Sequence, residues 1–328
     1  MVSKTDSRTG KRLGWAYDIA GNLSSKIDYQ GKETLYTYDD TNRLVAMSNK
    51  DYLQASYHYD AAGRLLSRIL SNGASTLYTY DKDNYLKKIM QRSSNGSIID
   101  DRIFSHDDIG NITQALITGG NTINYAYDPA YRLLSADSSN NANDEAYTYD
   151  AVGNRASVTI NGNTKYYIYN NTGNRLNEVR QNNQLINSYE YDNNGSRVIK
   201  RNGSGTIVES YTYNQKRLVT QMTSSGATAT FAYDPNAYRI QKIAGAVTNN
   251  YLLEAENLEA IYDENDQLKA SYLRGVVVDE IINGFKRDSS GKMQNRSFHH
   301  DQINSVVALS DHTGAATQTK GYDSFGSE

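Results

Sequence analysis

One short motif recurs along most of the 328-residue chain. It consists of an aromatic residue, any residue, tyrosine, aspartate or asparagine, two more residues, and usually glycine or asparagine. The first of eleven copies reads WAYDIAGN from Trp15, and the last reads FAYDPNAY from Phe231. A regular period of about 21 residues is typical of repeat architectures, in which each unit packs on its neighbours. The second aromatic is His106 in one copy and a tyrosine in the other ten, namely Tyr17, Tyr38, Tyr59, Tyr80, Tyr127, Tyr149, Tyr169, Tyr191, Tyr213 and Tyr233.

Each copy predicts a β-hairpin. Aromatics at positions i and i+2 share one face of a strand, and the small or polar residue between them, such as Thr37 or Thr148, faces the other way. The aspartate followed by Gly-Asn or Gly-Arg favours a tight turn. A short second strand follows, and a second turn often carries Asn-Gly, as at Asn72-Gly73, Asn95-Gly96, Asn161-Gly162 and Asn202-Gly203.

Hairpins of this kind are marginally stable alone, so we expect them to pair in one continuous antiparallel sheet. Eleven units give about 22 strands and, at about 4.8 Å per strand, a sheet about 105 Å wide. Open twisted sheets rarely exceed about ten strands without curling. The predicted fold class is therefore all-β, with repeated antiparallel hairpins in a continuous curved or spiral sheet around a space.

Composition narrows the function classes. The chain has 28 Tyr against 5 Phe and 1 Trp, and no run approaches the length of about 20 apolar residues that a membrane-spanning helix needs. It carries 34 Lys and Arg against 37 Asp and Glu, without a long basic block, so nucleic acid is not expected as a partner. The absence of cysteine excludes disulfides and thiol catalysis, and the N-terminus shows no apolar signal-peptide region.

Candidate chemical sites have simpler structural explanations. We interpret the tyrosines as sheet packing, with sugar stacking as the alternative, and the repeated aspartates as turn residues, with calcium binding as the alternative. His299-His300-Asp301 with Ser305 suggests a catalytic triad, but neighbours on one segment seldom converge on a nucleophile. Zinc is disfavoured because adjacent side chains of a strand point to opposite faces. Asp279-Glu280, beside Val276-Val277-Val278, is interpreted as a strand end. No catalytic residue, metal or cofactor is predicted.

The repeat resembles the YD repeat of the RHS family from Trp15 to about Ile240. A second segment, from Phe298 to Gly326, is similar to the opening of the RHS-associated core, although Asn304 stands where that core usually has glycine. The residues that carry this second match are His300, Asp301, Ser305, Asp311, Gly314, Tyr322, Asp323 and Gly326.

The resemblance implies a hollow spiral β-shell, as in polymorphic toxins, insecticidal toxin complexes and teneurins. In toxin members the shell encloses a C-terminal toxin, and the core carries an aspartyl autoprotease whose motifs we expect beyond Glu328, so no protease residue is assigned. The expected parts are a YD-repeat shell over 1–245, a degenerate extension over 246–296 and the start of the core over 297–328.

The predicted role is a non-enzymatic scaffold of an RHS-type toxin, secreted or at the cell surface within a larger protein. Its expected partners are a toxin cargo polypeptide or further shell segments. The alternative is a cell-surface adhesion or carbohydrate-binding module, with glycans as partners.

Overall fold

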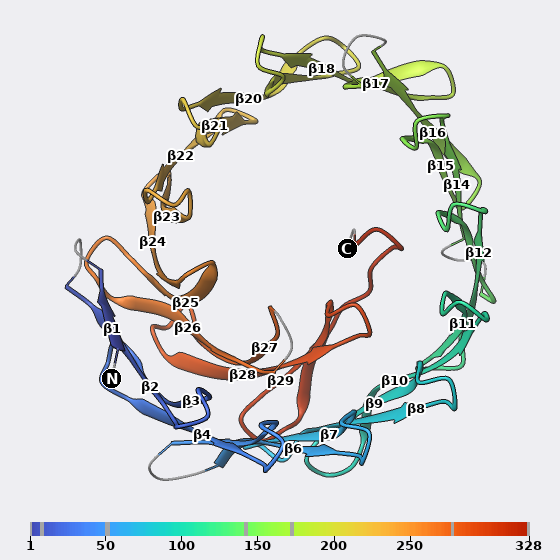
Figure 1. Ribbon diagram of the computed structural model, residues 1–328. Helices are drawn as coiled ribbons and strands as arrows, with labels where there is room; N and C mark the ends of the chain where they lie inside the picture. The colour runs from blue at the N-terminus through green and yellow to red at the C-terminus, as the bar shows by residue number, and fades with distance from the viewer. Residues whose placement is uncertain are drawn as a thin grey trace. The chain divides into compact units, whose positions relative to one another are not determined.

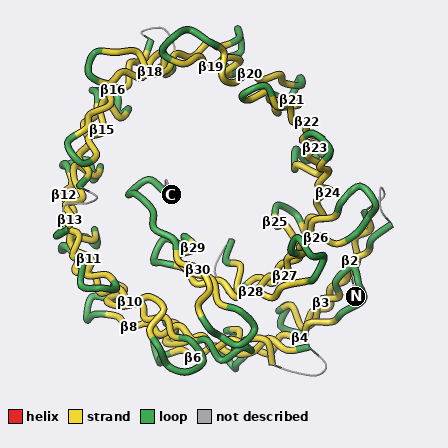
Figure 2. Tube along the Cα trace, turned by 180° about the vertical axis from the view of Figure 1, so that it is seen from behind, coloured by secondary structure: helices red, strands yellow, loops and turns green. Residues whose placement is uncertain are grey.

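The computed structural model describes residues 2–6, 10–49, 53–140, 144–170, 174–276 and 279–326. This described part contains thirty strands and no helix. Its all-β architecture can be followed in Figures 1 and 2. In chain order the strands are β1 (Val2–Thr5), β2 (Arg12–Tyr17), β3 (Leu23–Ile27), β4 (Glu33–Tyr38), β5 (Leu44–Ser48), β6 (Leu53–Tyr59), β7 (Leu65–Leu70), β8 (Ser75–Tyr80), β9 (Leu86–Arg92), β10 (Ile98–His106), β11 (Ile112–Ile117), β12 (Thr122–Tyr127), β13 (Leu133–Ser138), β14 (Glu145–Tyr149), β15 (Arg155–Ile160), β16 (Asn163–Tyr169), β17 (Leu176–Gln181), β18 (Gln184–Tyr191), β19 (Arg197–Asn202), β20 (Ile207–Tyr213), β21 (Val219–Ser224), β22 (Ala227–Tyr233), β23 (Arg239–Ala244), β24 (Val247–Glu254), β25 (Asn257–Tyr262), β26 (Leu268–Arg274), β27 (Ile281–Arg287), β28 (Met293–His300), β29 (Val306–Ser310) and β30 (Ala316–Thr319).

The strands belong to one 30-stranded sheet, and consecutive strands such as β14 to β17 pair in antiparallel fashion. In β14 and β15, Tyr147 lies opposite Val158, and the register shifts by one residue just before Tyr149. The same shift precedes Tyr38 in β4 and Tyr59 in β6. The predicted fold class, repeated antiparallel hairpins in a continuous sheet, is confirmed.

The side chain of the repeated aspartate stabilises the turn by accepting hydrogen bonds from backbone N–H groups of that turn. At Asp60 the side-chain Oδ1 accepts hydrogen bonds from the backbone N–H of Ala62 and of Arg64, at 3.0 and 2.9 Å. Gly63 adopts a φ of 84° there, which glycine reaches without steric cost. Arg64 Nε donates to the second carboxylate oxygen at 2.6 Å. These hydrogen bonds, the one from the Arg64 backbone first, lower the pKa of Asp60, so the turn is held by an ionised carboxylate.

One of the predicted Asn-Gly turns has the geometry of the aspartate turns instead of a two-residue Asn-Gly turn. At Asn202-Gly203 it is Gly205, not Gly203, that adopts a positive φ, of 84°. Asn202 Oδ1 accepts from the backbone N–H of Ser204 and of Thr206, at 3.1 and 3.0 Å. Asn202 therefore takes the role that aspartate has in the other turns, because its amide oxygen accepts the same two hydrogen bonds.

The second tyrosine of each repeat ties that repeat to the one before it. Tyr59 Oη in β6 donates to the backbone oxygen of Leu44 at the start of β5, at 2.9 Å. We call the side of the sheet that carries these tyrosines the tyrosine face. The equivalent bonds are Tyr38 to Leu23, Tyr80 to Leu65, Tyr127 to Ile112, Tyr149 to Leu133, Tyr169 to Arg155, Tyr191 to Leu176, Tyr213 to Arg197, Tyr233 to Val219 and Tyr322 to Val306. Tyr17, by contrast, is 55% exposed.

The chain divides into two compact units. Unit 1 comprises Met1–His106, Leu116–Gly119 and Leu268–Glu328, and unit 2 comprises Asp107–Ala115 and Gly120–Gln267. In unit 1, residues 279–315, here called the C-terminal layer, pack on strands of the first half of the chain (Figure 1). The predicted boundaries at residues 245 and 296 follow repeat similarity instead and stay a prediction. In the described part of the chain no helix is long and apolar enough to cross a membrane.

The core of unit 1 lies where the C-terminal layer meets the tyrosine face. Ile282 of β27 is fully buried in a cluster with Met47, Ala55, Tyr57 and Leu70. Fully burying a large apolar side chain such as Met47, Leu70 or Ile282 contributes on the order of 1.5–3 kcal/mol. Unit 1 is therefore two-layered at this point.

Candidate functional site: the interface of the C-terminal layer in unit 1

Polar side chains beside the apolar cluster of Ile282 fix the C-terminal layer to strands β7 to β10. A buried ion pair joins Arg68 of β7 to Glu280, which directly precedes β27. The two side chains are only 1% and 4% exposed. The second amino nitrogen of Arg68, Nη2, also lies 3.4 Å from Thr76 Oγ1 and 3.5 Å from the backbone oxygen of Phe298. Burying one such charge alone would be very costly, so each partner needs the other.

Arg68 occupies a position that most repeats fill with an apolar residue. It lies opposite Tyr57, the first aromatic of its repeat, in the register of β6 and β7. The residues opposite the first aromatic of the two flanking repeats are Met47 and Ile89. Three other repeats carry a lysine at the equivalent position, namely Lys26, Lys200 and Lys242, so the cation alone does not identify this site from the sequence.

Two amides from the first half of the chain bind the backbone of the layer. Asn72 Nδ2 donates to the backbone oxygen of Asp311 at 2.8 Å and to Ser297 Oγ at 3.0 Å. Gln91 Nε2 donates to the backbone oxygen of His300 at 2.6 Å. Asn72 and Gln91 therefore fix the position of the layer through its backbone, and Asn72 also through the hydroxyl of Ser297.

Gly314 sits where the turn at Asp311 presses against the turn at Asn72. Its φ is 81°, and a Cβ atom there would lie 2.6 Å from the backbone oxygen of Asn72 and 2.8 Å from the Cβ of Ser94. Ser94 Oγ in turn donates to the backbone oxygen of Thr313 at 2.5 Å. Glycine is therefore required both by the backbone conformation and by the contact.

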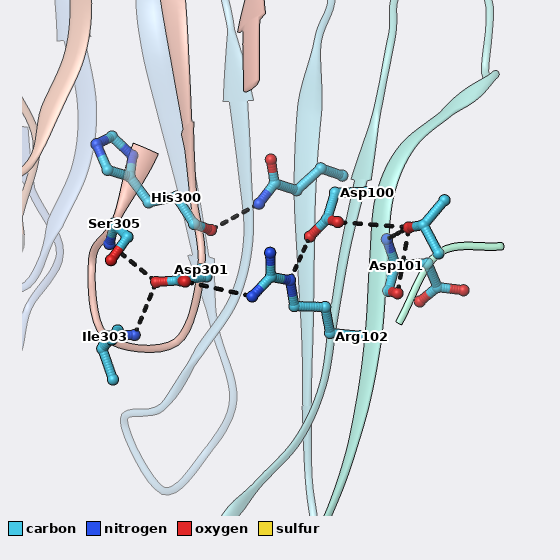
Figure 3. A network of polar contacts seen from close by, with 9 residues as sticks. Asp100, Asp101, Arg102, His300, Asp301, Ile303 and Ser305 are labelled. Carbon is cyan, nitrogen blue, oxygen red and sulfur yellow. Dashed lines mark hydrogen bonds and ion pairs between the residues drawn. The ribbon is translucent and has the colours of Figure 1, made fainter. Parts of the chain in front are cut away.

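Figure 3 shows a polar network at the far end of the same interface. Arg102 of β10 donates from Nη1 to Asp301 Oδ2 at 3.2 Å and from Nε to Asp100 Oδ2 at 2.8 Å. The other oxygen of Asp301 accepts from the backbone N–H of Ile303 and of Ser305, at 3.1 and 2.8 Å. Asp301 therefore forms a repeat turn and, at the same time, an ion pair with Arg102 of β10, on which the layer packs.

The two histidines at the end of β28 are both buried, with 1% and 8% of their surfaces exposed for His299 and His300. The register between β28 and β29 shifts between them. Burial, and then the nearby positive charge of Arg68, lower the pKa of His299 to about 3 and that of His300 to about 4. His299 Nε2 lies 2.9 Å from Ser310 Oγ. Both imidazoles are therefore neutral at pH 7.

The predicted core residues form three successive repeat turns and do not meet in one pocket. His300, Asp301 and Ser305 belong to the first turn, in which Asn304 has a φ of 67°, a conformation that asparagine tolerates. Asp311 and Gly314 form the second turn, and Asp323 and Gly326 form the third, with Tyr322 bound to the Val306 backbone oxygen.

A catalytic triad is not assembled from these residues. Asp301 is engaged by Arg102 and by backbone N–H groups, and buried His299 contacts Ser310 instead of Ser305. Glu280 does lie at a strand end, as predicted, but its pairing with Arg68 was not predicted. Val277 and Val278 lie outside the described residues.

Comparisons with known proteins agree with this architecture. The family profile described as Teneurin YD-shell matches residues 95–328, and the RHS Repeat profile matches residues 17–52 and 59–97. No curated protein matches the chain. The Tc holotoxin pore of Photorhabdus luminescens, solved with a variant TccC3, has a similar fold, with a TM-score of 0.71 and 17% identity over 97% of this chain. A crystal structure of a TcdB2–TccC3 complex gives a TM-score of 0.65 and 16% identity over 96% of this chain.

This chain spans 18% of the length of each of those two solved chains. The shared fold extends over nearly all of this chain, and the Teneurin YD-shell profile alone covers more than half of it. The chain therefore belongs to the Teneurin YD-shell family.

Proposed function

We propose that the chain is a non-enzymatic scaffold, a wall segment of an RHS-type shell that encloses a polypeptide cargo. In this proposal the tyrosine face is the side that receives the cargo. The shell belongs to a secreted or cell-surface protein, and its partners are a toxin polypeptide and further shell segments. The fold that the chain shares with Tc toxin components supports this role.

One observation carries the proposal: in unit 1 a polypeptide segment already lies on the tyrosine face. The C-terminal layer buries Ile282 against that face and is bound through side chains such as Asn72 and Gln91. Tyrosine suits a face of this kind because its ring packs while its hydroxyl stays hydrogen-bonded. The hydroxyl of a second tyrosine such as Tyr59 or Tyr80 binds a carbonyl of the preceding repeat, so the ring is held in place and remains available for packing.

Face-specific crosslinking tests the proposal. The chain contains no cysteine, so a benzophenone can be attached to a single introduced cysteine. Ala229→Cys places the crosslinker on the tyrosine face of β22, because Ala229, Phe231 and Tyr233 are two residues apart along the strand and share one face. Thr230→Cys is the matched control, one residue away on the opposite face.

The probe is a long unfolded synthetic peptide of glycine, serine, leucine and glutamine, which carries no side-chain charge. We expect several-fold more crosslinking from position 229 than from position 230. Equal yields from the two faces, or no crosslinking from either, would contradict the proposed role.

A further inference from the structure

The tyrosine face of unit 2 carries an excess of positive charge. The strand sequences and registers from β14 to β23 place six cations and two carboxylates on it, which leaves a formal charge of +4. The cations are Arg155, Lys165, Arg197, Lys200, Arg239 and Lys242, and the carboxylates are Glu145 and Glu209.

The opposite face of the same strands is neutral. Its four charged residues form two pairs: Arg180 with Glu178 at 2.8 Å, and Arg201 with Glu190 at 2.7 Å. The positive charge is therefore a property of one face and not of the strands as a whole.

The arginines of the tyrosine face are held in place by aromatic rings. Arg197 lies 5.5 Å from the ring centre of Tyr189 and 5.1 Å from that of Tyr211. Arg155 and Arg239 are flanked by two rings in the same way, at 4.8 to 5.9 Å. Stacking uses the flat faces of the guanidinium and orders it before any ligand arrives, which reduces the entropic cost of binding.

The six cations form three groups, each of one arginine and one lysine, and the groups are evenly spaced. Arg155, Arg197 and Arg239 lie in β15, β19 and β23, four strands apart, which corresponds to about 19 Å across the sheet. Lys200 and Arg197 share Glu209 as an ion-pair partner, at 3.0 and 3.6 Å. The side-chain amines of Lys165 and Lys242, however, have no hydrogen-bond or ion-pair partner among the described residues.

Unit 1 shows how a cation at the position of Lys242 can be neutralised. Lys242 lies opposite Phe231, the first aromatic of its repeat, just as Arg68 lies opposite Tyr57. Arg68 is paired with Glu280, a carboxylate on a segment that packs on the tyrosine face. The same arrangement at Lys242 requires a carboxylate from a polypeptide that lies on this face of unit 2.

From these observations we propose that the tyrosine face of β14 to β23 binds an extended polypeptide segment rich in Asp or Glu. This inference rests on the proposed function and adds to it the chemical class of the cargo segment. A single-stranded nucleic acid fits less well, because its closely spaced phosphates would meet cation groups only about every 19 Å.

Binding of labelled peptides to the full chain, measured by fluorescence anisotropy, tests the inference. The probes are unfolded Gly-Ser peptides that carry glutamate, glutamine or lysine at the same positions, together with an oligothymidylate. The test variant is Lys165→Gln with Lys242→Met, and the control is Arg180→Gln with Arg201→Gln, which removes the same charge from the opposite face.

The glutamate peptide should bind most tightly, and added salt should weaken its binding. The test variant should weaken it about fivefold, as expected for the loss of two exposed ion pairs, and the control by less than about twofold. Equal losses in the two variants, equal binding of the glutamate and glutamine peptides, or tighter binding of oligothymidylate would overturn the inference. The crosslinking experiment with the uncharged peptide decides the proposed function separately, because that peptide does not depend on these cations.

Discussion

The buried pair of Arg68 and Glu280 predicts that the C-terminal layer is stabilised by mutual neutralisation. Replacing Glu280 by glutamine leaves the guanidinium of Arg68, which is 1% exposed, without a counter-charge. Removing one partner of a buried ion pair typically costs about 3–5 kcal/mol, so we expect a loss of unfolding free energy in that range. Arg68→Met, which introduces the residue that the repeat of Met47 uses, should cost a similar amount because it strands the carboxylate.

The double variant separates charge pairing from packing. With both charges gone, Arg68→Met with Glu280→Gln should be more stable than either single variant. Trp15 is the single tryptophan of the chain and lies buried in unit 1, so its fluorescence during urea unfolding reports on this unit. Lys88→Gln is the control, because it removes the partly exposed ion pair of Lys88 with Asp101 in the same unit and should cost less than about 1 kcal/mol.

Two results would refute this reasoning. If Glu280→Gln costs less than about 1 kcal/mol, the pair does not behave as a buried ion pair. If the double variant loses as much as the two single variants together, the two charges act independently, and their proximity does not stabilise the layer.

Three further predictions concern pH, turn geometry and the tyrosines. The adjacent buried histidines at the end of β28 have lowered pKa values in the folded protein, so the unfolded state takes up protons at a higher pH than the folded state does. The free energy of unfolding should therefore be highest above pH 6.5 and fall toward pH 4, by up to about 1.4 kcal/mol per pH unit for each histidine. A urea midpoint that stays constant from pH 7 to 5 would contradict this. Gly314→Ala should lower the thermal midpoint more than Gly205→Ala, because both have a positive φ but only the first Cβ meets neighbouring atoms, and equal shifts would argue against the contact. Tyr80→Phe should cost about 1 kcal/mol of unfolding free energy in urea because a partly buried carbonyl loses its donor, whereas Tyr166→Phe, at a half-exposed ring, should cost almost nothing.

The repeat made the local structure predictable. An aspartate with glycine or asparagine three residues later is enough to place a turn, and tyrosines two apart are enough to define a face, because both rules act within one hairpin. Asn202 shows the limit of this reading: the dipeptide Asn-Gly suggested a two-residue turn, but the neighbouring Gly205 allowed the longer turn of the aspartate type.

The site depended on contacts that no local rule contains. Arg68 and Glu280 are 212 residues apart, and Gln91 and the His300 backbone are 209 apart. Their pairing depends on the C-terminal layer packing on the first half of the chain, which repeat spacing does not predict. Arg68 departs from the apolar residue that most repeats have at its position, but so do Lys26, Lys200 and Lys242, and nothing in the sequence indicates that Arg68 alone pairs with Glu280.

The bond from each repeat tyrosine to the carbonyl of the preceding repeat has a consequence for how such chains can grow. In Tyr59 and Leu44, as in the other pairs, donor and acceptor belong to consecutive units, so the contact requires nothing from distant parts of the chain. A gene duplication that inserts one whole unit supplies a new donor and a new acceptor together, and every older bond is kept. Evolution can therefore change the length of the sheet one unit at a time, without redesigning the units already present.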